Sequence, residues 1–184
     1  MSLLYAVDPG TTQSALVVVC RGGPFGIEVL SARTMLNAVL LQRLSSVGDW
    51  IAREPASLVI EQIASFGMPV GAEVFTTVWW TGRFYEAWPG HSSRHMLPRS
   101  AVKLHLCQTM RAKDAHIRQS LLDRFGGSTA IGKKASPGPL YGLKSHQFAA
   151  FAVAVTWLDQ HASPSVSTAA NTLPVGVEAN TTKA

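Results

Sequence analysis

Two carboxylates stand at the ends of short apolar stretches of the sequence. Asp8 follows the run LLYAV and opens a DPG turn, and Glu61 follows the run SLVI. An acid at the end of a buried strand is costly unless a cation or another partner meets it. If both stretches are strands of one sheet, the two acids can lie side by side, and a divalent cation would relieve their repulsion. For Asp8 alone, a simple Asp-Pro-Gly turn is an alternative interpretation.

Two further residues could take part in such a site. His146 begins the last predicted helix, where it could be a third ligand or a proton-transfer group, although a lone histidine is more often a hydrogen-bonded surface or core residue. Asp114 precedes an amphipathic run, and helix capping is enough to explain it. The two cysteines, Cys20 and Cys107, have no CxxC spacing. We expect two reduced, buried thiols, and an oxygen-rich site that favours Mg²⁺ or Mn²⁺ over zinc.

The positive charge of the chain is concentrated in one segment. The whole sequence carries a formal charge of +5, but ten of its 16 lysines and arginines lie between Arg94 and Lys144, where the only acids are Asp114 and Asp123. A field of one sign attracts polyanions such as nucleic acid, with a bland basic surface as the alternative. The candidate DNA contacts in this segment are Arg99, Lys103, Arg111, Lys113, Arg118, Lys133, Lys134 and Lys144.

Length and composition predict one folded domain. With 184 residues, 47% apolar and 15% charged, the chain can bury a sizeable core. We expect a domain over residues 1–162 and a disordered tail over 163–184, where Ser, Thr, Pro and Asn occur without periodicity. No stretch has the length of a membrane span, and the beginning of the sequence lacks the pattern of a signal peptide. These features predict a cytoplasmic protein without a membrane partner.

Hydrophobic periodicity predicts three strands, a helix and a fourth strand, followed by a helix, a fifth strand and further helices. Strands are expected over residues 3–7, 14–20, 27–33, 57–61 and 94–97. Helices are expected from Asn37, as an N-cap, through Ile51, and over 72–88 and 99–110. Another helix is expected after Asp114, also as an N-cap, followed by a last helix over 145–160. A basic loop is expected over 131–142.

The predicted helix over residues 72–88 contains six large aromatic side chains, too many for one stripe. A helix that is apolar around more than one face is either deeply buried or packed on a partner chain. We favour burial on one side and a homodimer contact on the other, with burial alone as the alternative.

Taken in order, four motifs resemble those of RuvC-type Holliday junction resolvases, and most closely the branch found in phages and mobile elements. They are AVDPGTTQSALVVV, LVIEQIASFGMPVG, the basic pair RSAVKLHL and RAKDAHIRQSLLDRFG, and SHQFAAFAVA. The resemblance implies an α/β protein of RNase H-like fold, with a five-stranded mixed sheet flanked by helices. It also implies a homodimer that binds two Mg²⁺ per active site and nicks a four-way DNA junction symmetrically.

The resemblance also assigns residues. Asp8 matches the metal-binding aspartate of the first strand and Glu61 the glutamate of the fourth. His146 falls where the family has an acid or a histidine. Phe66 lies near the position of an aromatic or apolar wedge against the junction bases, with ordinary loop packing as the alternative. Ala149 departs from the family, because many relatives have a further metal-binding Asp there.

Ala149 leaves two explanations open. Either the missing acid comes from elsewhere, with Asp114 as the nearest candidate, or the chain is a weakened or inactivated nuclease. We therefore expect a metal-dependent crossover junction endonuclease with Asp8, Glu61, His146 and Asp114 as its catalytic residues. The first three of these would hold the metal.

Three alternatives to a junction-resolving nuclease remain. One is a junction-binding protein with weak or no nuclease activity, and another is an RNase H-like nuclease that acts on other branched DNA or on RNA. Sugar kinases and actin-like ATPases share the DPGT opening, but they need two lobes and a far longer chain.

Overall fold

A computed structural model describes residues 2–48, 55–64, 69–90 and 93–161. The predicted wedge Phe66, the helical position Ile51 and the tail 163–184 lie outside the described residues, so these predictions, like the domain boundary at 162, stay predictions.

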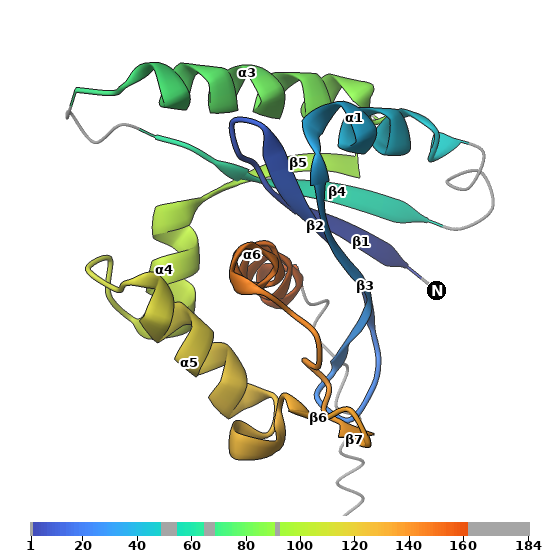
Figure 1. The fold of residues 1–184 in the computed structure, drawn as a ribbon, viewed down its shortest axis with the longest axis vertical. Helices are drawn as coiled ribbons and strands as arrows, with labels where there is room; N and C mark the ends of the chain where they lie inside the picture. Colours follow the sequence, from blue (N-terminus) through green and yellow to red (C-terminus); the bar gives the residue numbers. More distant parts are fainter. Residues whose placement is uncertain (1, 49–54, 65–68, 91–92, 162–184) are drawn as a thin grey trace, which may run out of the picture.

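Five strands form one mixed sheet in the order β3-β2-β1-β4-β5 (Figure 1). β1 pairs antiparallel with β2 and parallel with β4, β3 continues the antiparallel side, and β5 continues the parallel side. The strands are β1 (Leu3–Asp8), β2 (Gln13–Arg21), β3 (Ile27–Leu36), β4 (Ala56–Gln62) and β5 (Arg94–Pro98).

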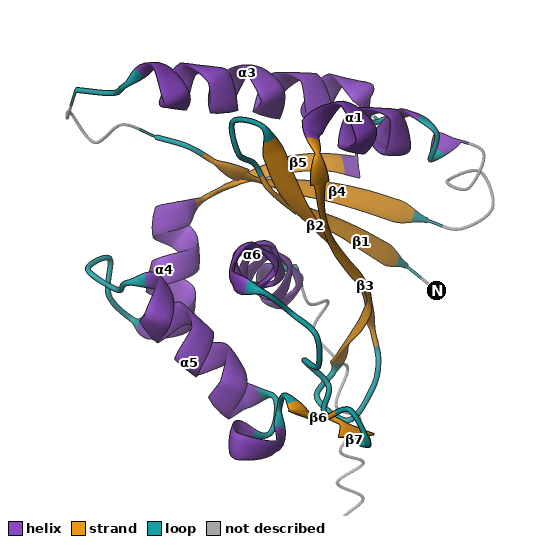
Figure 2. Cartoon of the chain, in the orientation of Figure 1, coloured by secondary structure: helices purple, strands orange, loops and turns teal. Residues whose placement is uncertain are grey.

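Helices cover both faces of the sheet (Figure 2). One face is covered by α1 (Asn37–Ser45) and α3 (Ala72–Ala87), and the other by α6 (Ser145–Gln160). The helices α4 (Arg99–Cys107) and α5 (Asp114–Arg124) pack on the outer side of α6. A 3₁₀ turn (Gly127–Thr129) follows α5, and the small strands β6 (Gly132–Lys133) and β7 (Ser136–Pro137) pair antiparallel.

The alternation of side chains along the strands builds two cores. Leu16 of β2 belongs to the core under α1 and α3, whereas its neighbours Ala15 and Val17 belong to the core around α6. α6 is buried on nearly all sides because it lies between the sheet and two helices. Its alanines and valines suit this position, since small side chains allow close approach. The beginning of α6 is thereby fixed against the sheet.

The register of the central strands brings the two predicted acids together. Val7 of β1 pairs with Ile60 of β4 in parallel register, so the next residues, Asp8 and Glu61, lie side by side at the strand ends. Residues paired in this way point to the same face of a sheet. Since Val7 and Ile60 face α1 and α3, Asp8 and Glu61 face α6.

Three local predictions were wrong. Asn37 and Asp114 are not N-caps, because α1 and α5 begin with them and Leu36 and Lys113 hold the capping positions. Each side chain instead bonds to a distant partner, described below. The predicted loop over 131–142 contains the hairpin of β6 and β7, so Lys133 lies in a strand and Lys134 in the turn.

Two other sequence features are settled among the described residues. Cys20 and Cys107 are both free; Cys20 is buried, as predicted, but Cys107 is only half-buried. Within the described ranges, no helix combines the length and the apolar character required to cross a lipid bilayer.

Asn37 ties α1 to the turn that follows Asp8. Its amide Nδ2 donates to the carbonyl oxygen of Gly10 at 2.9 Å, and its Oδ1 accepts from the hydroxyl of Ser14 at 2.7 Å. The Ser14 hydroxyl in turn accepts from the Gly10 amide at 3.1 Å. Gly10 itself is required there, because a Cβ would collide with the carbonyl oxygen of Gln13.

The substitution Asn37→Ala should lower the free energy of unfolding by about 2 to 3 kcal/mol, because it leaves the buried Ser14 hydroxyl and the Gly10 carbonyl without their partner. Urea denaturation measures the change. Ser45→Ala, at an exposed position of the same helix, is the control and should cost under about 0.5 kcal/mol. Equal losses in the two variants would contradict this account of the turn.

Candidate active site

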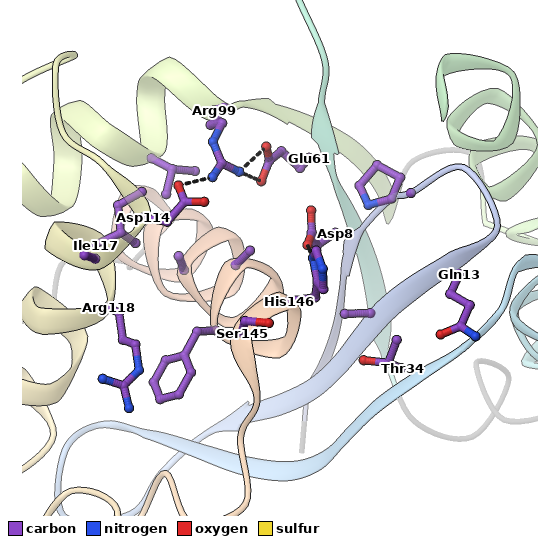
Figure 3. Close-up of a pocket in the computed structure, with 18 residues that line it drawn as sticks. Asp8, Gln13, Thr34, Glu61, Arg99, Asp114, Ile117, Arg118, Ser145 and His146 are labelled. Carbon is purple, nitrogen blue, oxygen red and sulfur yellow. Dashed lines mark hydrogen bonds and ion pairs between the residues drawn. The ribbon is translucent and has the colours of Figure 1, made fainter. Parts of the chain in front are cut away.

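Asp8 and Glu61 lie in a cavity of about 440 Å³ between the strand ends and the helices α4, α5 and α6 (Figure 3). Their side chains are 13% and 8% exposed. Glu61 is one of the few buried charged residues of the described chain. Two like charges are therefore held close together in a partly dry site, as the two strand ends predicted.

The pKa of Asp8 is raised by its burial and by the neighbouring charge of Glu61. Burial is the larger cause and the nearby charge of Glu61 the second, and together they raise the pKa of Asp8 from 3.8 to about 6. His146 and Arg99 partly oppose the shift, because positive or hydrogen-bonding neighbours favour the ionised carboxylate. The acid pair is therefore poised to accept a cation near neutral pH.

His146 contacts Asp8 from the first turn of α6. Its Nδ1 lies 3.2 Å from Oδ2 of Asp8, and 76% of its side chain is exposed. The backbone amide of Lys144 donates to Oε1 of Gln147 at 3.0 Å, which closes the start of the helix beside it. The structure thus joins three sequence-predicted site residues, Asp8, Glu61 and His146, in one cavity.

Arg99, at the start of α4, occupies the other side of the cavity. Its Nη1 donates to both carboxylate oxygens of Glu61, at 2.7 and 3.0 Å, and its Nη2 donates to Asp114. Burial alone would lower the pKa of the Arg99 guanidinium, but Glu61 and Asp114 outweigh it and raise the pKa. Arg99 therefore stays a cation bound between two acids.

Sequence reasoning assigned Arg99 to DNA phosphates and did not pair it with Glu61. The sequence did contain a signal for this contact, because Arg99 directly follows the strand that lies beside the strand of Glu61. In that pairing Pro98 is opposite Gln62. The catalytic role of Asp114 stays a prediction. Asp114 reaches the cavity through Arg99 while 80% of its side chain remains exposed.

Ala149 lines the cavity as well. It follows His146 by three residues on α6, so both positions face the same space. The position where the resemblance implies a further acid therefore lies at the site and carries only a methyl group.

The predicted DNA contacts lie around this cavity to different degrees. Arg118 of α5 lines it, with its guanidinium 4.8 Å from the centre of the Phe148 ring. Arg111 and Lys113 are exposed between α4 and α5, and Lys103 is half-buried. The remaining three are exposed near the hairpin and the start of α6: Lys133, Lys134 and Lys144. Their contacts with DNA stay predictions.

The donor set suits a hard divalent cation. Asp8 and Glu61 offer carboxylate oxygens whose repulsion such an ion would relieve. In the part of the chain that the structure describes, no group of three or more His, Cys, Asp or Glu side chains is already arranged around one point. Arg99 donates to both oxygens of Glu61, so a cation would compete with the guanidinium for this carboxylate. The residues fit the ion, but the site is not assembled for it.

Comparison of the sequence with protein-family models and with curated proteins gives no match. Solved structures do match. The structure of Thermus thermophilus RuvC in complex with a Holliday junction substrate has a TM-score of 0.60 and 18% identity, over 84% of this chain and 91% of that chain.

A second Thermus thermophilus RuvC structure has a TM-score of 0.59 and 17% identity, over 86% of this chain and 95% of that chain. The chain therefore has the fold of RuvC. The predicted RNase H-like fold, with a five-stranded mixed sheet flanked by helices, is confirmed.

The raised pKa of Asp8 predicts that this carboxyl group makes the folded protein less stable at neutral pH than at acidic pH. Between pH 3.8 and about 6 the folded state binds more protons than the unfolded state, so stability falls as the pH rises through this range. An asparagine does not ionise. Asp8→Asn should therefore gain up to about 3 kcal/mol relative to the parent protein between pH 4 and pH 7.5.

Thermal and urea unfolding at both pH values measure this gain. Asp123→Asn removes an exposed carboxylate outside the cavity and serves as the control. A stability difference between the Asp8→Asn and parent proteins that does not change with pH would show that burial beside Glu61 does not raise the pKa of Asp8.

Proposed function

We propose, from the RuvC fold of the chain and the chemistry of its cavity, that this protein is a metal-dependent endonuclease that resolves four-way DNA junctions by paired nicking. One observation carries the proposal: Asp8 and Glu61 lie side by side at adjoining strand ends, with His146 against Asp8. A DNA substrate of chromosomal or phage origin would place the activity in the cytosol.

Asp8, Glu61 and His146 would hold the metal, two Mg²⁺ per active site, with Mn²⁺ able to replace them. Bound there, the ions would supply an activated water and would stabilise the charge on the departing 3′ oxygen. Asp114 would be the nearest source of a further carboxylate, because it shares the Arg99 guanidinium with Glu61.

The protein's own side chains would position the water, the phosphate and the DNA backbone. His146 is exposed and bonded to Asp8 through Nδ1, so its Nε2 would either hold the second cation or orient a water and take its proton. Arg99, once released from Glu61, would contact the phosphate that replaces the carboxylate. The basic residues around the cavity would hold the DNA backbone and fix its register without reading sequence.

One observation favours a second candidate function. Ala149 lines the cavity where the resemblance implies an acid, and Arg99 already neutralises Glu61. Both features weaken metal binding. The second candidate is therefore a junction-binding protein with little or no nuclease activity.

The decisive experiment incubates the purified protein with Mg²⁺ and labelled four-way, flap and duplex DNA. We expect paired symmetric nicks on the four-way junction, and loss of cleavage with retained binding in Asp8→Asn and Glu61→Gln. The expected drop in rate is at least about a hundredfold, because each substitution removes a ligand oxygen at the reacting centre.

The variant Ala149→Asp and the control Asp123→Asn complete this experiment. A parent protein that binds the junction without cutting, together with an Ala149→Asp variant that cuts, would establish the second candidate. Cleavage of flaps or of RNA, with the four-way junction left intact, would assign a different branched substrate. Cleavage by Asp8→Asn at the parent rate would refute the site.

We propose further that the protein acts as a homodimer through α3. Phe84 of this helix is fully buried, whereas Phe75, Val78 and Trp79 are 64%, 47% and 57% exposed. Arg83 lies over the ring of Trp79 at 4.6 Å, so the exposed surface is aromatic and cationic together. A two-fold axis through this surface would present two sites to opposing strands of a symmetric junction.

Multi-angle light scattering tests the dimer. The parent protein should have twice the mass of the chain, and the double variant Phe75→Glu/Trp79→Glu should have the monomer mass with unchanged far-UV circular dichroism. Met110→Glu, at an exposed apolar position in the turn between α4 and α5, is the control and should remain dimeric. A monomeric parent protein would remove α3 as an interface.

A further inference from the structure

A second groove lies at the free edge of the sheet, where the edge strand β3 meets α1. We call it the edge groove. It is lined by Arg33, Thr34 and Met35 of β3 and by Val39, Gln42, Arg43 and Ser46 of α1. None of these residues is in the basic segment that the sequence analysis singled out.

The edge groove is positively charged and uncompensated. Arg33 and Arg43 are both exposed, and among the residues that the structure describes no carboxylate lines the groove. Neither guanidinium group makes an ion pair or a hydrogen bond with another of the described residues. Arg99 and Arg124, in contrast, each bind an acid. Two unengaged guanidinium groups in one groove are suited to an anionic ligand.

The other lining residues fit a nucleic-acid backbone. Gln42 is exposed and its side-chain amide can donate hydrogen bonds to phosphate oxygens. The Ser46 hydroxyl donates to the carbonyl oxygen of Arg43 at 3.0 Å. Val39, half of which is exposed, provides apolar surface of the kind that sugars contact. A small anion would need only the arginines, so the mixed lining favours an extended polymer.

Thr34 connects the edge groove with the acid cavity, because it lines both. It pairs with Ala15 in the β2–β3 register and therefore faces α6, where its hydroxyl accepts from Nε2 of Gln147 at 3.4 Å. Arg33 pairs with Leu16 and points to the opposite face. A chain that leaves the cavity past Thr34 would thus meet Arg33 at the edge of the sheet.

The two positive regions lie on different sides of the acids. In Figure 3, Arg99, Asp114 and Arg118 lie on one side of Asp8, and Thr34 and Gln13 lie on the other. A strand that crosses the cavity would then be held before and after Asp8.

We propose that the edge groove binds the backbone phosphates of the nucleic-acid strand that leaves the acid cavity, through Arg33 and Arg43. This inference rests on the proposed function, because it requires a nucleic-acid strand in the cavity. It extends the contact surface beyond the basic segment to residues that no feature of local charge density identified.

Binding of a labelled four-way junction, measured in EDTA so that cleavage is absent, tests the groove over a range of salt concentrations. Each lost phosphate contact should make the slope of log K against log salt shallower by about 0.9. The double variant Arg33→Gln/Arg43→Gln should therefore lose about 2 units of slope. Arg33→Lys/Arg43→Lys, which keeps the charges, should retain the parent slope.

Arg21→Gln is the comparison for Arg43→Gln, since each removes one charge and Arg21 lies at the far end of β2 from the cavity. Arg21→Gln also removes a hydrogen bond to the carbonyl oxygen of Leu158, so the fold of this variant is checked by circular dichroism. Only Arg43→Gln should change the slope. Junctions with arms too short to reach the groove should bind the parent and the double variant equally.

Three outcomes would overturn the inference: an unchanged slope in the double variant, an equal change in Arg21→Gln, or a parent protein that binds no nucleic acid. A change of oligomeric mass in the double variant would assign the groove to a second copy of the chain instead. A protein that binds DNA through Arg33 and Arg43 but never cuts would uphold the inference and defeat the proposed nuclease. Cleavage with an unchanged slope would do the reverse.

Discussion

The repulsion between Asp8 and Glu61 is the constraint on which the rest of the site depends. The parallel register of β1 and β4 fixes the two acids side by side, and burial keeps water from screening them. Each acid has a nitrogen partner from a different helix: His146 of α6 contacts Asp8, and Arg99 of α4 donates to Glu61. The buried bonds of Asn37 to Gly10 and Ser14 hold the turn that carries Asp8. Distant elements thus converge to stabilise one charged pair.

Arg99 couples this pair to the helices above it. Its guanidinium spans Glu61 on the sheet and Asp114 on α5, so the position and charge of all three are linked. A metal ion at Glu61 would share the same oxygens with the bifurcated hydrogen bond from Nη1 of Arg99, so the two compete there. Because Asp114 is largely exposed, it can follow Arg99 or leave it at little cost in desolvation. Metal binding in the proposed enzyme would therefore involve rearrangement of α4 side chains.

The basic residues divide into two groups according to their partners. Arg124 binds Asp159 through two hydrogen bonds, at 2.5 and 2.9 Å, and His105 contacts the same carboxylate at 2.7 Å. This cluster joins α4, α5 and α6, so Arg124 serves the fold. Arg33 and Arg43, outside the basic segment, have no such partner within the described residues. In the proposed complex, local charge density therefore identifies only part of the nucleic-acid surface.

The sequence by itself determined the strands, the two acids at their ends and the resemblance to a family with the observed fold, because these depend on short patterns and on the order of motifs. It also identified His146, which lies at a helix start. Only the tertiary structure decided the roles of Arg99, Asn37 and Asp114, since each side chain bonds to residues far away in the sequence: Glu61 lies 38 positions from Arg99. Local propensity explained Asn37 and Asp114 as caps, but packing gave their side chains buried or charged partners instead. Contacts of that kind arise from how the sheet and helices fit together, and no local pattern contains them.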